Sequence, residues 1–160
     1  MPTKYAGTKS EVRALNAHIK LLRAAESMTA RLTALIADQT GLTISQFGAL
    51  ESIFHLGPIC QKEIAEKQLK SGGNITLVID NLEKRELVRR ERSQADRRLV
   101  IVHLTVSGKK LISDYFPCHA KAVEHEMGVL TNAEQDQLAD LGKKLGLQIG
   151  RSGYPKGCYT

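Results

Sequence analysis

No stretch of the sequence is apolar and free of charge over the roughly 18 residues that a membrane-spanning helix requires, so we expect no insertion into a membrane. The first residues, MPTKYAGTKSEVRA, lack the apolar segment of a secretory signal peptide. Cysteine is scarce: Cys60, Cys118 and Cys158 are an odd number, and they show no C-x-x-C spacing. These absences predict a cytoplasmic protein whose thiols are reduced.

The motifs of the common enzyme classes are also missing. The sequence has no H-E-x-x-H, P-loop, G-x-G-x-x-G or G-x-S-x-G pattern, and no cysteine or serine with a locally placed histidine and acid. The nearest approach to a metal-ligand cluster is Cys118, His119 and His125. On a helix, however, Cys118 and His125 would lie about 10 Å apart and His119 would face elsewhere. We therefore predict no catalytic activity, no cofactor and no metal site.

What the sequence has in surplus is positive charge. Its 160 residues, enough for one good core, carry a formal net charge of +6. Most of the excess falls between Lys70 and Lys110, and from Lys84 to Arg98 seven basic side chains stand against three acidic ones. A charge that served only solubility would be spread along the chain. The concentration of charge indicates a polyanionic partner.

Residues 69–105 predict a helix followed at once by a two-stranded hairpin. Ser71 can cap the helix, and two β-prone runs, 86–91 and 99–104, enclose the charged turn SQADRR. Four apolar residues recur at helical spacing and mark the inner face of the helix: Ile75, Val78, Ile79 and Leu82. A helix followed by a basic hairpin is typical of a winged helix that binds DNA.

Ahead of this stretch we predict three helices. The first is long and amphipathic and ends near Gly41. The second begins at the capping box of Thr43 and Gln46 and stops at Gly57-Pro58. The third is short, from about Gln61 to Leu69, with Cys60 as its N-cap, and it leads into a helix-turn-helix.

After the hairpin we predict two more helices. Thr105 caps the first, which Pro117 should kink, and the second opens at the capping box of Thr131 and Glu134. Apolar residues at helical spacing form a narrow stripe on the last helix: Leu138, Leu141, Leu145 and Ile149. A single small domain would not cover this stripe, so we expect the outer helices to pair two subunits.

The hairpin carries a more specific pattern, D-x-R-x-x-x-V-x-L-T, formed by Asp96, Arg98, Val102, Leu104 and Thr105 and placed in register with the LE that ends the preceding helix. On these residues the chain, from about Glu11 to Gly150, resembles the multiple-antibiotic-resistance regulator (MarR) family of bacterial transcription factors. The resemblance implies a mainly α fold with a small β-hairpin wing. It also implies one domain over residues 1–160, with dimerisation helices at 11–40 and 105–150 and a winged helix-turn-helix at 43–104.

The sequence departs from the family pattern at two positions. Glu86 stands where a glycine usually follows the helix, which costs about 1 kcal/mol in a left-handed cap. Leu77 stands where a polar or basic residue is common, and it could touch a thymine methyl group or belong to the core.

The resemblance places Arg98 in the minor groove and Arg97 on a phosphate, while the Asp96 carboxylate would fix the geometry of a neighbouring arginine. Ser71 could serve as a simple cap, a DNA contact, or both. The full set of predicted DNA-binding residues is Lys70, Ser71, Asn74, Thr76, Leu77, Arg90, Arg92, Arg97 and Arg98.

We predict a homodimeric regulator that binds a pseudo-palindromic double-stranded DNA site and represses transcription until a small aromatic or quinone-like ligand releases it. The resemblance puts the ligand between the dimerisation helices and the DNA-reading module. Four side chains could reach that pocket, although each also fits an ordinary core position: His18, Phe47, His55 and Tyr115.

Two alternatives stay open. A winged helix can also bind an acidic protein partner instead of DNA. The input can also be oxidation of Cys60, because a helix N-terminus favours a thiolate, although a buried and inert cysteine fits the same position.

Overall fold

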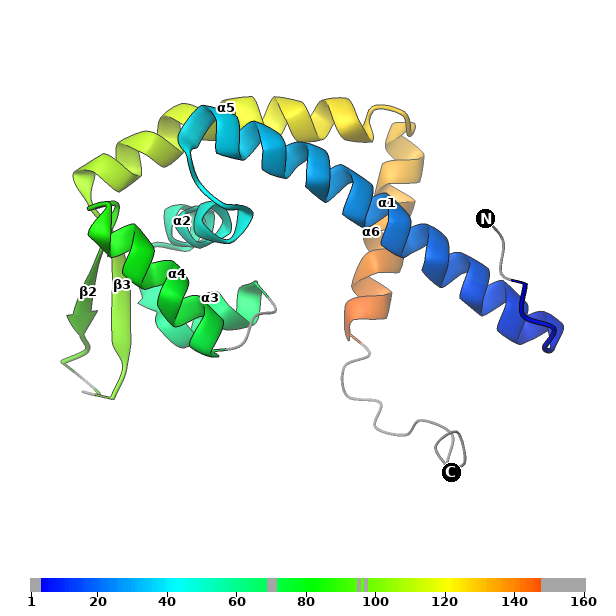
Figure 1. Ribbon diagram of the computed structural model, residues 1–160, viewed down its shortest axis with the longest axis horizontal. Coiled ribbons are helices and arrows are strands. Elements are labelled where there is room, and N and C mark those ends of the chain that lie inside the picture. Colours follow the sequence, from blue (N-terminus) through cyan, green and yellow to red (C-terminus); the bar gives the residue numbers. More distant parts are fainter. Residues whose placement is uncertain (1–3, 69–71, 95, 97, 148–160) are drawn as a thin grey trace. The chain divides into compact units, whose positions relative to one another are not determined.

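The protein is mainly helical with a small antiparallel sheet, as predicted. The computed structural model describes residues 4–68, 72–94, 96 and 98–147. In chain order its elements are α1 (Lys9–Thr40), α2 (Ile44–Leu56), β1 (Ile59–Cys60), α3 (Gln61–Lys67), α4 (Gly72–Lys84), β2 (Val88–Arg92), β3 (Val100–Leu104), α5 (Val106–Met127) and α6 (Asn132–Gly146) (Figure 1).

Capping chemistry fixes where the helices begin. At α2, the Thr43 hydroxyl accepts a hydrogen bond from Gln46 N–H (3.2 Å), and the Gln46 side chain accepts one from Thr43 N–H (2.9 Å). Thr131 and Glu134 form the same box at α6. Both predicted boxes are confirmed. α1 ends at Gly41, whose φ of +64° is the left-handed conformation that glycine adopts at little cost.

The hairpin is part of a three-stranded sheet in the order β1-β3-β2. β2 pairs with β3 as predicted, with Arg90 opposite Val102. The sequence did not predict β1, because two residues are too few to show the alternation of a strand. Ile59 pairs with Val102, so this short strand attaches the start of α3 to the wing.

The turn between α4 and β2 contains the one non-glycine residue with a positive φ among the residues that the structure describes. Leu87 N–H donates to Leu82 O (3.0 Å) and Glu86 N–H donates to Glu83 O (2.9 Å), which together form a Schellman cap. Glu86 occupies its left-handed position with φ of +56°. The cap therefore forms without the glycine that usually supports it. The Thr105 hydroxyl donates to Glu86 O (2.6 Å) and holds the start of α5 to this turn.

Among the described residues, those up to Ala122 form one compact unit and those from Val123 form a second. In the first unit, α2 contacts α1, α3, α4 and β3 (Figure 1). Its core contains the predicted inner face of α4 together with Ile36, Leu50, Ile64, Val102 and Ile112. Gly108 packs so closely on Leu87 that an added Cβ would collide with the Leu87 carbonyl oxygen.

In the second unit, α6 buries none of its side chains. The predicted stripe is exposed, with Leu138, Leu141 and Leu145 exposing 41%, 51% and 60% of their surface. Ile149 lies outside the described residues. Within the described part of the chain, no helix combines the length and apolar character needed to cross a bilayer.

Candidate DNA-binding surface and ligand cavity

Helix α4 separates an apolar inner face from a polar outer one. Ile75, Ile79 and Leu82 are almost completely buried, whereas Asn74 and Thr76 are exposed. Leu77, which could have faced either outward or into the core, exposes 60% of its surface and therefore faces outward. The predicted residues Lys70 and Ser71 lie outside the described part of the chain.

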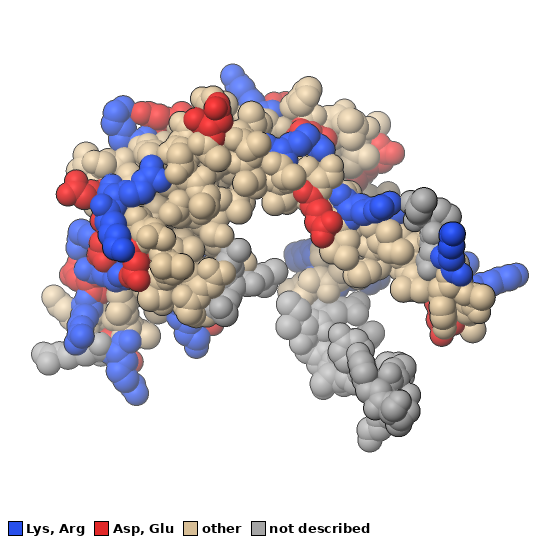
Figure 2. Space-filling model, viewed as in Figure 1, with Lys and Arg blue, Asp and Glu red and all other residues tan. Residues whose placement is uncertain are grey.

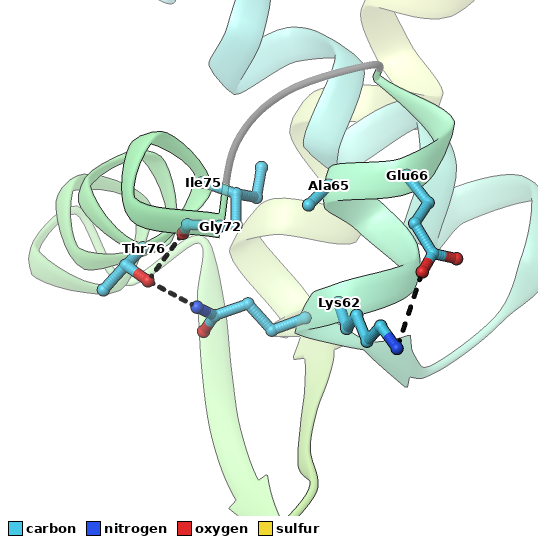
Figure 3. Close-up of a pocket in the computed structure, with 7 residues that line it drawn as sticks. Lys62, Ala65, Glu66, Gly72, Ile75 and Thr76 are labelled. Atoms are coloured by element: carbon cyan, nitrogen blue, oxygen red, sulfur yellow. Dashed lines mark hydrogen bonds and ion pairs between the residues drawn. The ribbon is translucent and has the colours of Figure 1, made fainter.

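The outer face of α4 borders a groove of about 560 Å³ between α3 and α4 (Figure 3). Across this groove the Gln61 side chain donates to the Thr76 hydroxyl (2.8 Å), which itself donates to Gly72 O (3.0 Å). Thr76 is therefore held in a fixed rotamer and keeps only acceptor capacity for an additional partner. Gln61 was not among the predicted site residues, because a single glutamine at a helix start gives no sequence signal.

Arg90 joins the wing to both helices of this groove. Its guanidinium forms ion pairs with Asp80 (2.6 Å) and Glu83 (3.0 Å), and its Nε donates to the Gln61 side chain (3.3 Å). Only 23% of the Arg90 side chain is exposed. These contacts position α4 against β2, and a direct contact of Arg90 with DNA stays a prediction.

The tip of the wing presents Arg98. Its side chain is 90% exposed, and the Asp96 carboxylate accepts hydrogen bonds from Arg98 Nε (3.1 Å) and from Arg98 N–H (3.0 Å). The hydrogen bonds from Arg98 hold the pKa of Asp96 below its ordinary value, so the carboxylate stays ionised to a lower pH than a free aspartate. The expected contact between Asp96 and a neighbouring arginine is present, and it directs a guanidinium away from the protein.

Basic side chains gather over the wing, with acidic ones among them (Figure 2). Arg89 is paired with Glu91 (2.7 Å), which neutralises part of this charge. Arg92 is exposed and has no ion-pair partner among the described residues. Arg97 lies outside them. Arg92 and Arg98 are therefore the predicted wing cations best placed to meet an anionic partner.

A second hollow, of about 320 Å³, lies among α1, α2, the end of α3 and α5. Its lining combines an aromatic wall with polar groups: Thr29, Ile44, Ser45, Phe47, Gly48, Glu51, Gln68 and His119. The Phe47 and His119 rings lie 4.6 Å apart, and Tyr115 packs edge-on behind Phe47 at 5.7 Å. Burial raises the pKa of Tyr115, which keeps its hydroxyl protonated.

His119 is the unexpected member of this cavity. Its Nδ1 is buried and has no hydrogen-bond partner among the described residues. A buried polar atom without a partner costs free energy, so this nitrogen would gain from a bound group that supplies one. Sequence reasoning considered His119 only as a metal ligand. Its position four residues after Tyr115, on the same helix face, was the signal that could have identified it.

The predicted pocket residues are only partly brought together. Phe47 lines the cavity and Tyr115 supports it, whereas His18 is exposed on α1 and does not line it. His55 is also exposed and packs against Phe54 (5.2 Å) and Phe116 (4.7 Å) instead. His18 lies about three turns before Thr29, the α1 residue that lines the cavity, and His55 lies one turn after Glu51, the last α2 residue that lines it. Both helices are therefore longer than the cavity, and each histidine falls on the part beyond it.

Cys60 is the N-cap residue of α3, as predicted. Its N–H donates to the Glu63 carboxylate (2.9 Å), and its thiol is free and half-buried. Cys118 is free and exposed. Among the residues that the structure describes, no three potential metal ligands come together.

Comparison with known proteins gives consistent matches. The model of the MarR family matches residues 42–100. The HTH-type transcriptional regulator MhqR of Bacillus subtilis (strain 168) is 33% identical over 135 residues, which are 84% of this chain and 92% of the relative.

Two solved structures extend the comparison. BpsR of Bordetella bronchiseptica, whose DNA binding is regulated by 6-hydroxynicotinic acid, aligns with a TM-score of 0.73 at 26% identity and covers 81% of this chain and 98% of that one. Sco3205 of Streptomyces coelicolor, a MarR family regulator solved in complex with DNA, aligns with a TM-score of 0.80 at 20% identity over 93% of this chain and 94% of that one. The predicted winged-helix fold is confirmed.

Proposed function

Because this chain belongs to the MarR family of transcriptional regulators, we propose that it is a homodimeric repressor that binds a pseudo-palindromic operator and is released by a small aromatic or quinone-like molecule. Family membership makes it a DNA-binding regulator rather than an enzyme. The homodimer, the repression and the ligand are the proposed parts.

The main observation in favour of DNA binding is that α4 and the wing both expose side chains that can contact DNA. Asn74, Thr76 and Leu77 face outward from α4, where short polar groups and an apolar side chain can meet base edges and a thymine methyl group. Arg98 extends from the wing at a geometry held by Asp96, which suits insertion into a minor groove. The remaining proposed contacts are to phosphates, from the wing and from the start of α4: Arg92, Arg97, Lys70 and Ser71.

The exposed stripe on α6 supports the homodimer. Three leucines that expose 41% to 60% of their surface would be costly to leave in water at successive turns of one helix. A two-fold partner that presents the same stripe would bury them. The two α4 helices of such a dimer would enter major grooves about 34 Å apart, one turn of DNA.

The cavity beside His119 supports release by a small ligand. Its volume of about 320 Å³ lies within the range of small-molecule sites. The half-buried His119 ring, packed on the buried Phe47 ring, offers a stacking surface, and His119 Nδ1, which has no partner among the described residues, would gain one from a hydroxyl, carboxyl or carbonyl group that reaches it. An aromatic acid, phenol or quinone matches this combination.

Selection of bound genomic fragments tests the proposal. The purified protein should retain a small number of fragments that contain an inverted repeat, and log affinity should fall steeply with log salt because several phosphates are neutralised. Retention of an acidic protein together with unselective DNA retention would instead support the interaction-module alternative. Aromatic acids and quinones added to the retained complex should then include a releasing compound.

Oxidation of Cys60 is the second candidate input, and the free, half-buried thiol is the observation in its favour. Under that mechanism, peroxide or quinone treatment releases the wild type from DNA, while Cys60→Ser binds normally and stays bound. Release of both proteins alike would leave the cavity as the input.

A further inference from the structure

One short helix, α3, joins the cavity wall to α4, which is the recognition helix of the proposed DNA-binding surface. At its start, the Gln61 side chain donates to the Thr76 hydroxyl on α4 (2.8 Å). At its end stands Gln68, the C-cap residue, which lines the ligand cavity. Because α3 has only seven residues, a displacement at one end is transmitted to the other with little bending.

The Gln68 amide fastens the end of α3 to the first turns of α2. In the orientation that satisfies both ends of the amide, its Nε2 donates to Ser45 O (3.3 Å) and its Oε1 accepts from Ala49 N–H (2.8 Å). These two backbone groups are four residues apart and would ordinarily bond to each other within the helix. The Gln68 side chain therefore contacts both ends of one backbone hydrogen bond of α2 and fastens the end of α3 to this turn of the helix.

Gly48 provides the space for this insertion. A Cβ at position 48 would lie 3.5 to 3.7 Å from the atoms of the Gln68 amide, which is van der Waals contact, so a side chain that extends further toward Gln68 would displace the amide. Gly48, Ser45 and Gln68 all line the cavity that holds His119. A molecule that fills this cavity and hydrogen-bonds to Ser45 would compete with Gln68 for that contact.

We propose that Gln68 is the positioning residue through which the cavity controls the recognition helix. While Gln68 holds the end of α3 on α2, the bond between Gln61 and Thr76 keeps α4 in its DNA-reading position. An occupant that displaces the amide frees the end of α3, and the displacement reaches α4 through Thr76. This inference rests on the proposed function and adds the route by which ligand binding weakens DNA binding.

The first test replaces Gln68 with methionine, which has a similar length and no hydrogen-bonding amide. Gln39→Met is the matched control, because Gln39 is an exposed glutamine of α1 whose amide contacts only Asp38 in the described structure. Gln68→Met should bind the selected operator about five- to tenfold more weakly, the effect of losing one or two modest hydrogen bonds. Gln39→Met should bind like the wild type.

The second test uses Gly48→Leu to displace the amide without changing Gln68, as a bound molecule would. It should weaken operator binding by a factor similar to that of Gln68→Met, and the double variant should be no weaker than either single variant. Additive effects would show that the two positions act separately and would overturn the proposal. If Gly48→Leu does not fold in a thermal melt, Gln68→Met decides alone.

Hydrogen exchange of the free protein separates this inference from the proposed function. In Gln68→Met, amides within 72–80 should exchange several-fold faster than in Gln39→Met, with no DNA present. Unchanged exchange together with operator affinity within twofold of wild type would overturn the role of Gln68. Failure of the wild type to select any DNA would instead refute the proposed function, and the exchange result would still decide the link between the cavity and α4.

Discussion

Replacement of Arg90 by methionine tests whether this arginine positions the wing or contacts DNA. Methionine keeps most of the apolar stem and removes the guanidinium donors that reach Asp80 (2.6 Å), Glu83 (3.0 Å) and Gln61 (3.3 Å), while the backbone N–H of residue 90 still donates to Glu83 (3.0 Å). The two carboxylates are left without their cation. Water can reach them, because Asp80 and Glu83 expose 40% and 41% of their side chains.

The magnitude follows from this partial exposure. A fully buried pair that loses its cation costs 3 kcal/mol or more, whereas an exposed pair contributes about 1 kcal/mol or less. With Arg90 23% exposed and its partners more so, we expect a loss of about 2 kcal/mol in the free energy of unfolding. At a typical urea dependence this lowers the unfolding midpoint by about 1 M.

Urea unfolding measures this loss, and Arg89→Met is the matched control. Arg89 also pairs with a glutamate (2.7 Å), but both side chains are about half exposed, so its removal should leave the midpoint unchanged within error. Equal midpoints for the two variants would refute the structural role of Arg90. The salt dependence of operator binding then decides its contact with DNA. An unchanged slope indicates positioning, and a slope reduced by about 0.9 indicates a lost phosphate contact.

Three further predictions concern the wing, its turn and the last helix. Arg98→Ala should weaken operator binding roughly ten- to a hundredfold and flatten the salt slope without affecting dimerisation, and an unchanged affinity would remove the wing tip from DNA binding. Glu86→Gly should raise the free energy of unfolding by about 1 kcal/mol, because glycine adopts the observed φ of +56° without strain. This corresponds to a rise of roughly 2 to 4 °C in Tm, and a lower Tm would contradict this account. Deletion of residues 131–160 should give an aggregated or unfolded chain, and sedimentation of a folded monomer would show that α6 does not close a dimer.

Much of the fold was predictable because its signals are local. Thr43 and Gln46 form their box within one helical turn, and Gly41 ends α1 through its own backbone freedom. The inner face of α4 was visible as a period of apolar residues, and the wing as two β-prone runs around a charged turn. The pairing of Asp96 with Arg98 is local as well, since the two residues are two positions apart.

The remainder depends on residues that only the folded chain brings together. Gln61 bonds to Thr76, 15 positions away in the sequence, and Arg90 bonds to Gln61, 29 positions away. Neither contact follows from the local pattern of helices and strands, because it depends on how those elements pack. β1 is a strand only because Ile59 pairs with Val102.

The cavity shows the same division between local and tertiary information. The sequence identified Phe47 as a candidate, but His18 and His55 were indistinguishable from it as isolated aromatic or imidazole side chains. Burial, ring contacts and the lack of a partner for His119 Nδ1 in the described part of the chain arise from the packing of α1, α2 and α5. Local sequence thus determined the helices, the strands and the wing. Tertiary packing decided which polar side chains were removed from water. A polar side chain that has lost its water gains from a specific hydrogen bond, and it can therefore hold a ligand or connect two helices.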